Sequence, residues 1–154
     1  MYAFLLSLHS LVRWAVLLSL LFSLFKAYQG KKNLLPFTPK DNSLRHITET
    51  ICHIQLILGL WLYFISPLID YFFTNIKEAV HHREIRFFGM EHITVMLIAI
   101  SVITIGSAKA KRKNTDAEKW KTIWVWYGIG LLLILISIPW SFSPLISRPL
   151  FRGF

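Results

Sequence analysis

Four long apolar segments constrain this chain of 154 residues more than any other feature. They cover roughly residues 3–25, 47–65, 87–107 and 123–138. A helix needs about 20 apolar residues to cross the hydrocarbon core of a bilayer. Because lipid offers no partners for backbone polar groups, segments this long and this few must be helices and not barrel strands. The pattern predicts an all-α fold, an integral membrane four-helix bundle that forms a single domain over residues 1–154.

Basic residues between the segments predict the orientation of the bundle. They occupy the first and the third connection: Lys26, Lys31, Lys32, Lys40 and Arg45, then Lys109, Lys111, Arg112, Lys113, Lys119 and Lys121. Lys and Arg accumulate in the cytoplasmic loops of membrane proteins. We therefore expect a multi-pass protein of the bacterial cytoplasmic (inner) membrane, in contact with membrane lipid and with both termini outside. The net charge of +9 then reflects topology, and no nucleic-acid partner is expected.

The remaining connections carry weaker signals. The stretch from Lys31–Lys32 to Asp41 contains two prolines and is expected to be an extended loop. Residues 70–80 include three consecutive aromatic residues, which predict a short helix at the membrane surface. Cys52 is the only cysteine, which excludes an intrachain disulfide and a thiolate metal cluster.

His9 and His92 lie near those ends of the first and third segments that the topology places on the same side of the membrane. At a rise of about 1.5 Å per residue, they lie roughly 9 and 8 Å below the outer ends of their helices. An ionisable side chain inside a bilayer is costly, so we expect it to have a partner or a function. Two histidines at matched depth on facing helices are what a haem iron needs for axial ligation. We interpret them as the metal ligands of one haem b; the alternative is that His9 bonds a backbone carbonyl and His92 bonds Glu91 or a serine of the first helix.

Three arginines lie near these histidines. Arg13 is one turn below His9 on the same face of the helix, and Arg83 and Arg86 lie at the mouth of the third segment. A guanidinium group matches a carboxylate bidentately, so we expect these arginines to bind the haem propionates. Glu91 points about 100° away from its histidine neighbour and is expected to face Arg13 or Arg86.

A second group of polar residues lies at the cytoplasmic end of the second segment. Spacings of three and four place His46, Glu49 and His53 on one helix face. The fourth segment offers no His, Asp, Glu or Cys in its apolar part, so a second haem with two histidine ligands lacks a ligand here. We expect Glu49 and His53 to face the bundle interior, where the group transfers protons or binds a quinone head group. The alternative is that His46 and Glu49 lie in the lipid headgroup layer and have no further role.

Several strings of the sequence carry a family resemblance. They are HSLVRW at residues 9–14, QLILGLWLYF at 55–64, the pair Glu91-His92, and the closing Ile138-Pro139-Trp140 with Arg148-Pro149-Leu150. Together they resemble a family of small bacterial four-helix membrane proteins, common in Bacteroidetes-type genomes and often labelled "cytochrome B". The resemblance spans nearly the whole chain. A fainter likeness, in architecture alone, is to one half of a haem A synthase, which is also a four-helix bundle with histidine haem ligands.

Two functions follow from these features. The first is a haem-binding, b-type cytochrome-like membrane protein in electron transfer, alone or as a subunit of a respiratory or other membrane complex. The second is a cofactor-free structural or accessory subunit of a larger inner-membrane complex. In that case the apolar helix faces pack against other membrane subunits or against a second copy of the chain.

Overall fold

The computed structural model describes residues 1–140 and residue 146, and these residues form helices and no strand. Four long helices carry the apolar segments: α1 (Tyr2–Lys32), α2 (Pro39–Ile65), α6 (His92–Arg112) and α7 (Asp116–Ser137). Shorter elements connect α2 to α6: α3 (Pro67–Thr74), α4 (Ile76–Ala79), α5 (Arg83–Arg86) and a π-helical turn, η1 (Phe87–Glu91). The predicted all-α fold class is confirmed.

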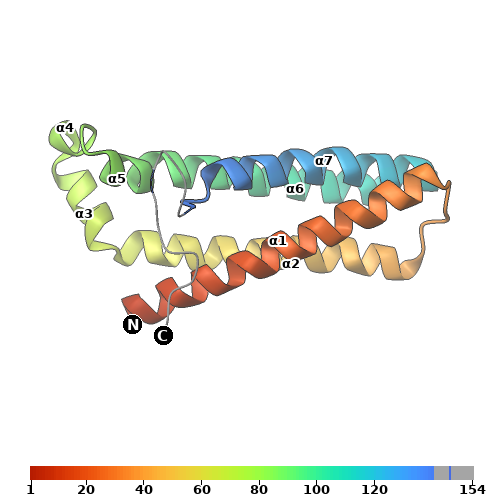
Figure 1. Ribbon diagram of the computed structural model, residues 1–154, viewed down its shortest axis with the longest axis horizontal. Helices are drawn as coiled ribbons and strands as arrows, with labels where there is room; N and C mark the ends of the chain where they lie inside the picture. Colours follow the sequence, from red (N-terminus) through yellow and green to blue (C-terminus); the bar gives the residue numbers. More distant parts are fainter. Residues whose placement is uncertain (141–145, 147–154) are drawn as a thin grey trace.

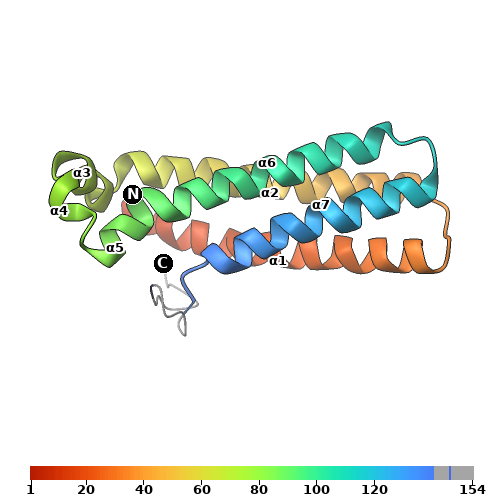
Figure 2. The ribbon, with the colours of Figure 1, turned by 90° about the horizontal axis from the view of Figure 1, so that it is seen from above.

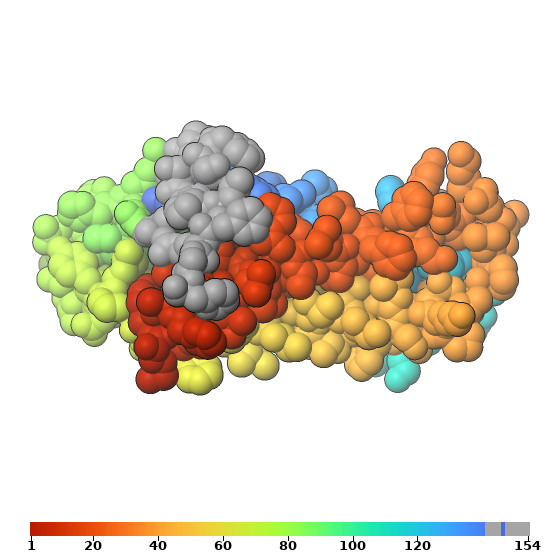
Figure 3. All heavy atoms as spheres, turned by 60° about the horizontal axis from the view of Figure 1, so that its bottom comes forward, coloured from red at the N-terminus to blue at the C-terminus, as the bar shows by residue number. Residues whose placement is uncertain are grey.

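The four long helices run alternately up and down in a single elongated bundle (Figures 1 and 2). α1 packs against α2 and α7, and α6 packs against α7 and α2. Figure 3 shows α1 and α2 side by side along one long face. By length and composition, α1, α2, the run Arg83–Arg112 and α7 can each cross a membrane. The chain is therefore a multi-pass membrane protein.

The two ends of the bundle differ in character. We call the end with the α1–α2 and α6–α7 connections the basic end, because most of the lysines lie there. The opposite end carries α3, α4 and α5, and we call it the cap end (Figure 1). α1 begins at the cap end and α7 ends there, and the third span also begins there. The first and third spans thus share an end, as the predicted topology requires.

The long helices extend beyond the apolar segments at the basic end. α1 continues to Lys32 and α2 begins at Pro39, so the extended loop expected up to Asp41 is reduced to residues 33–38. Thr38 and Asp41 form a reciprocal capping box around the start of α2, with Pro39 in the first turn. Proline is well tolerated there because the first helical N–H has no partner inside the helix. The basic residues assigned to loops consequently lie mostly in the terminal turns of helices.

The helix expected over residues 70–80 is present in two pieces. α3 begins earlier, at Pro67, and ends at Thr74, and the single turn α4 follows. Asn75 lies between them with φ −130°, and its side-chain amide donates to the Tyr71 carbonyl and to the Thr74 hydroxyl. Hydrogen bonds from an asparagine side chain to nearby backbone groups compete with the hydrogen bonds of a regular helix. This competition explains the interruption between α3 and α4.

Small residues allow the long helices to approach one another closely. A Cβ atom added at Gly106 of α6 would overlap the Cβ of Trp126 on α7, and one added at Gly130 of α7 would overlap Ile103 on α6. Such small-residue contacts are typical of helix interfaces in membranes, where van der Waals packing drives association. Ile103 and Tyr127 are fully buried beside them, which places the core at the centre of the bundle.

The close contact at Gly106 gives a test of this packing. We expect Gly106→Ala to lower the free energy of unfolding by about 1–3 kcal/mol, the usual cost of overpacking. The Trp126 Cβ is fixed to its own backbone, so α6 and α7 would have to separate. Gly128→Ala is the matched control, because its nearest atom, Leu24 Cδ2, would lie 3.9 Å away. Thermal unfolding of both variants in one detergent measures the difference, and equal melting temperatures would contradict this packing.

The charge difference between the two ends predicts the orientation in the membrane. We expect a reporter that is active only in the cytoplasm to be active when inserted after Lys113, in the α6–α7 connection. The same reporter fused after Phe154 should be silent. The reverse pattern would show that the basic end faces outward.

Candidate functional site

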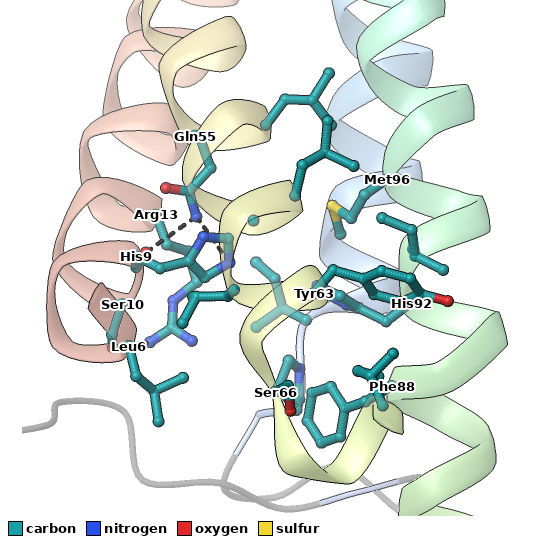
Figure 4. A pocket seen from close by; sticks show the side chains of 18 of the residues that line it. Leu6, His9, Ser10, Arg13, Gln55, Tyr63, Ser66, Phe88, His92 and Met96 are labelled. Atoms are coloured by element: carbon teal, nitrogen blue, oxygen red, sulfur yellow. Dashed lines mark hydrogen bonds between the residues drawn. The ribbon is translucent and has the colours of Figure 1, made fainter. Parts of the chain in front are cut away.

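A cavity of about 350 Å³ lies between the long helices in the cap-end half of the bundle. Its volume lies within the range of small-molecule sites, about 300–1,000 Å³. Apolar side chains from all four long helices form most of its wall, together with a few polar ones: Tyr2, His9, Ser10, Arg13, Gln55, Tyr63, Ser66 and His92. Figure 4 shows His9 and His92 on opposite sides of this cavity, on α1 and at the start of α6. The structure therefore brings together the two histidines that the sequence singles out.

The π-helical turn η1 precedes His92 directly. The His92 N–H bonds the carbonyl of Phe87, five residues back, and the Tyr63 hydroxyl donates to the Gly89 carbonyl at 2.7 Å. A π-turn holds one residue more than an α-turn, so it changes which face of the helix the following residues occupy. Such turns are frequent at functional sites. Gly89 is required at this point because a Cβ atom there would overlap the ring of Phe72.

His92 is held in one tautomer by the end of α7. Its Nδ1 lies 2.9 Å from the Ser137 carbonyl and 3.3 Å from the Ser137 hydroxyl. A carbonyl can only accept, so Nδ1 carries the proton and Nε2 carries the lone pair. No described residue makes a hydrogen bond to Nε2. Metal-binding histidines usually have this arrangement, with the other ring nitrogen donating to a carbonyl or carboxylate.

His9 is held by α2 through Gln55. The Gln55 amide nitrogen donates to the His9 carbonyl at 3.0 Å and lies 3.3 Å from the ring atom Nε2. Since the amide nitrogen is a donor, Nε2 accepts and the proton lies on Nδ1, which is buried without a partner among the described residues. Gly59 leaves the space for this ring, because a Cβ atom there would lie 3.1 Å from His9 Cε1. Any other group that binds Nε2 has to displace Gln55.

The three arginines expected near the histidines have different positions. Arg13 lines the cavity, and its Nη2 lies 3.4 Å from the Ser10 hydroxyl. Arg86 does not line it: its Nε donates to Glu91 at 2.7 Å and its Nη1 to a backbone carbonyl. Arg83 is exposed at the cap end and does not line the cavity either. Glu91 therefore has one of the two partners expected for it.

The hydrogen bonds of His92 differ from those that the cofactor-free alternative predicts for it. That alternative gives His92 a bond to Glu91 or to a serine of the first helix. The partner is instead Ser137 on α7, while Glu91 pairs with Arg86. The histidines therefore tie α1 to α2 and α6 to α7.

The second polar group lies towards the basic end, in the half of α2 away from the cavity. The Ser107 hydroxyl donates to Glu49 Oε2 at 2.7 Å, and His46 Nδ1 lies 3.6 Å from the same oxygen. His53 Nε2 lies 2.8 Å from the Thr104 hydroxyl. Glu49 and His53 thus both point at α6 and into the bundle, whereas His46 is exposed. Among the described residues, no group of three or more His, Cys, Asp or Glu side chains could hold a metal ion.

The sequence assignment of Arg45 to a loop is wrong. Arg45 lies inside α2 with only 5% of its surface exposed. Its guanidinium donates to Asn42 and to the carbonyl and hydroxyl of Ser107, and lies 3.6 Å from Glu49. α2 begins before the apolar segment does, so Arg45 lies within the helix. The Glu49 carboxylate one turn further on stabilises the buried guanidinium. The spacing of four between Arg45 and Glu49 was a signal for this pair.

Sequence reasoning also missed residues that complete the cavity. Tyr63 supports the π-turn, Gly59 leaves room for a ring, and Met96 lies one turn after His92 on the same side of α6. The spacing of four residues alone indicates that Gln55 and Gly59 share one face of α2. Nothing in the sequence indicates which neighbour that face meets.

No family model, no curated protein and no solved structure matches this chain. The resemblance to the small bacterial proteins labelled "cytochrome B" therefore stays a prediction based on sequence strings. One of those strings, Arg148-Pro149-Leu150, lies outside the described residues.

Proposed function

We propose that this protein is a haem-binding, b-type cytochrome-like membrane protein that takes part in electron transfer, and that His9 and His92 are the residues that would hold the haem iron. One observation carries the proposal: two histidines from different helices line one cavity inside a membrane bundle. A cofactor between facing side chains is a common arrangement in helix bundles, and haem iron with two histidine ligands needs no further protein ligand.

The residues around the cavity fit such a group. His92 already has the tautomer of a metal ligand, with Nδ1 bonded to a carbonyl. Phe88 and Met96 contribute apolar walls of the kind a porphyrin face packs against. Arg13 supplies a guanidinium at the cavity wall, where it can pair with a carboxylate that would otherwise be an unpaired charge in an apolar layer.

The chain itself would bind, orient and insulate the cofactor, and the haem would supply the one-electron chemistry. The Ser137 carbonyl would fix the orientation of the His92 ring and raise its basicity as a ligand. The apolar wall would exclude water from most of the site. Gln55 would compete for His9 Nε2, so binding at His9 would require this bond to open.

The cellular setting belongs to the same proposal. The predicted orientation places the basic end in the cytoplasm of a bacterium and the cavity in the outer half of the inner membrane. Membrane lipid surrounds the bundle, and other membrane subunits or a second copy are the expected protein partners. A quinone at His46, Glu49 and His53 stays a prediction, and a cofactor-free accessory subunit is the alternative outcome of the test below.

The absorption spectrum of the purified protein tests the proposal. We expect wild-type protein, purified from cells supplied with haem precursor, to show a Soret band and the sharp reduced bands of a low-spin haem. His92→Ala should abolish the low-spin spectrum, because it removes the better prepared ligand. His9→Ala should do the same or leave a high-spin, five-coordinate form.

His81→Ala is the matched control, because His81 is exposed at the cap end and does not line the cavity. Its spectrum should equal that of the wild type. A folded wild-type protein without a Soret band, or unchanged spectra in both ligand variants, would overturn the proposal. The histidines would then be interhelical hydrogen-bonding residues of an accessory subunit.

A further inference from the structure

The polar cluster at the basic end surrounds one carboxylate, that of Glu49. On α2, Arg45 lies one turn before it at 3.6 Å, and on α6 the Ser107 hydroxyl donates to its Oε2 at 2.7 Å. Only one of its two oxygens is occupied: no described residue makes a hydrogen bond to Oε1. The carboxylate is therefore held in place but has one free oxygen.

The cluster around Glu49 is open towards the basic end. The Glu49 side chain is 15% exposed, and His46, which is 70% exposed, lies 3.6 Å from it on the side of the basic end. Thr48, directly before Glu49, and Cys52, three residues further on, are completely buried. Water from the basic end can therefore reach this carboxylate.

The depth of Glu49 places it just inside the apolar layer. Counting about 20 residues back from Ile65, the end of α2, sets the other boundary of the layer near Arg45 and His46. Glu49 then lies roughly one helical turn, about 5 Å, inside that boundary. His46 lies at the boundary, next to the aqueous phase.

Stability does not require this arrangement. Burying an ion pair costs desolvation, and apolar residues of similar size often stabilise as well or better. An ionisable residue inside a membrane span is for that reason first considered functional. Arg45 also keeps Asn42 and the Ser107 carbonyl as partners when Glu49 is neutral, so loss of the Glu49 charge does not leave a buried cation without hydrogen bonds.

We propose that Glu49 is a proton-binding site that exchanges with the aqueous phase at the basic end, on the side where His46 lies. A proton from water forms the O–H bond at Oε1 and returns to water by the same route. Arg45 and Ser107 are positioning residues that hold Oε2. None of the contacts at Glu49 involves the cavity, so a protein that binds no haem keeps this site.

The other titratable groups around Glu49 are few. α2 contributes Cys52 and, one turn deeper, His53, which donates to Thr104 because that hydroxyl itself donates to a backbone carbonyl. α7 contributes Tyr127, whose hydroxyl donates to the Arg45 carbonyl. α6 offers only neutral hydroxyl groups at this level, and α1 contributes the Ser23 hydroxyl bonded to Thr48.

Labelling with dicyclohexylcarbodiimide tests the proposal in the full-length protein in lipid nanodiscs. This apolar reagent reacts with a protonated carboxyl: the acid proton moves to one nitrogen, the oxygen adds to the central carbon, and acyl transfer leaves a stable N-acylurea that retains the whole reagent. We expect mass spectrometry to find the adduct on Glu49, with a yield that falls as the pH rises from 5 to 9. E49Q should remove it, and Glu91, held by Arg86 at 2.7 Å, is the internal control for a paired carboxylate.

Two variants and one reagent-free measurement complete the test. R45Q should raise the yield at the higher pH values by roughly tenfold or more, because an opposite charge within 4–6 Å favours the ionised form. If R45Q does not fold, S107A should change the yield in the same direction, since it removes a hydrogen bond to the carboxylate. In vesicles with one orientation of the protein, the yield should follow the pH on the basic side.

Infrared pH-difference spectra of wild type and E49Q measure the same proton without any reagent. A carboxyl band present in wild type and absent from E49Q supports the proposal, also where the reagent fails to reach the site. Identical infrared spectra of wild type and E49Q would overturn the proposal. Labelling of R45Q without labelling of wild type would also overturn it, because Glu49 of the wild type would then be permanently ionised in a structural ion pair. A yield that follows the pH on the cap side would overturn the proposed access route.

Discussion

Each polar side chain inside the apolar spans needs a partner within the protein, and this constraint organises the whole bundle. Lipid tails are as apolar as leucine, so hydrophobicity alone does not decide which helices become neighbours. The polar bonds join the neighbouring pairs: Gln55 to His9, Ser23 to Thr48, His53 to Thr104 and His92 to Ser137. Each interhelical bond is worth about 0.6–2 kcal/mol, and each fixes a helix pair in register. The cavity and the basic-end cluster both lie where such bonds hold the helices.

α2 carries polar groups on two sides, and this determines where each group points. His53 and Gln55 are two residues apart, so they point about 200° away from each other around the helix axis. His53 therefore meets Thr104 on α6, while Gln55 meets His9 on α1. A single helix thus separates the two polar centres even though their residues alternate along it.

The sequence predicts those parts of the structure that depend on length, hydropathy and the rise of a helix. The four spans follow from apolar runs, and the common cavity of His9 and His92 follows from topology and depth. The π-turn before His92 could not be predicted, because it depends on Gly89 meeting Phe72 and on the bond from Tyr63, all tertiary contacts. The histidine reaches the cavity through this turn and not through a regular helix.

The burial of Arg45 shows the same limit at the other end. Charge counting assigns Arg45 to the first connection, because a lone cation in lipid is costly. Partners on α2 and α6 remove that cost, and those on α6 become visible only once the helices are placed side by side. For the same reason the sequence could not distinguish the roles of Arg86 and Arg13: both lie near the cap end, and the pairing of Arg86 with Glu91 is a contact of the folded chain.

Under the two proposals, a charge in the cavity and a charge at Glu49 interact electrostatically. Gln55 at the cavity and Glu49 are six residues apart on α2, which corresponds to about 9 Å along the axis. Two unit charges at that separation interact by about 2 kcal/mol at an effective dielectric constant of about 20. Six residues also turn about 240° around the helix axis, so 9 Å is the shortest separation and about 2 kcal/mol is the upper bound of the interaction. A negative charge gained in the cavity would favour a proton at Glu49 by no more than this energy. Because such coupling is reciprocal, a proton bound at the basic end would favour negative charge in the cavity equally, without any movement of the helices.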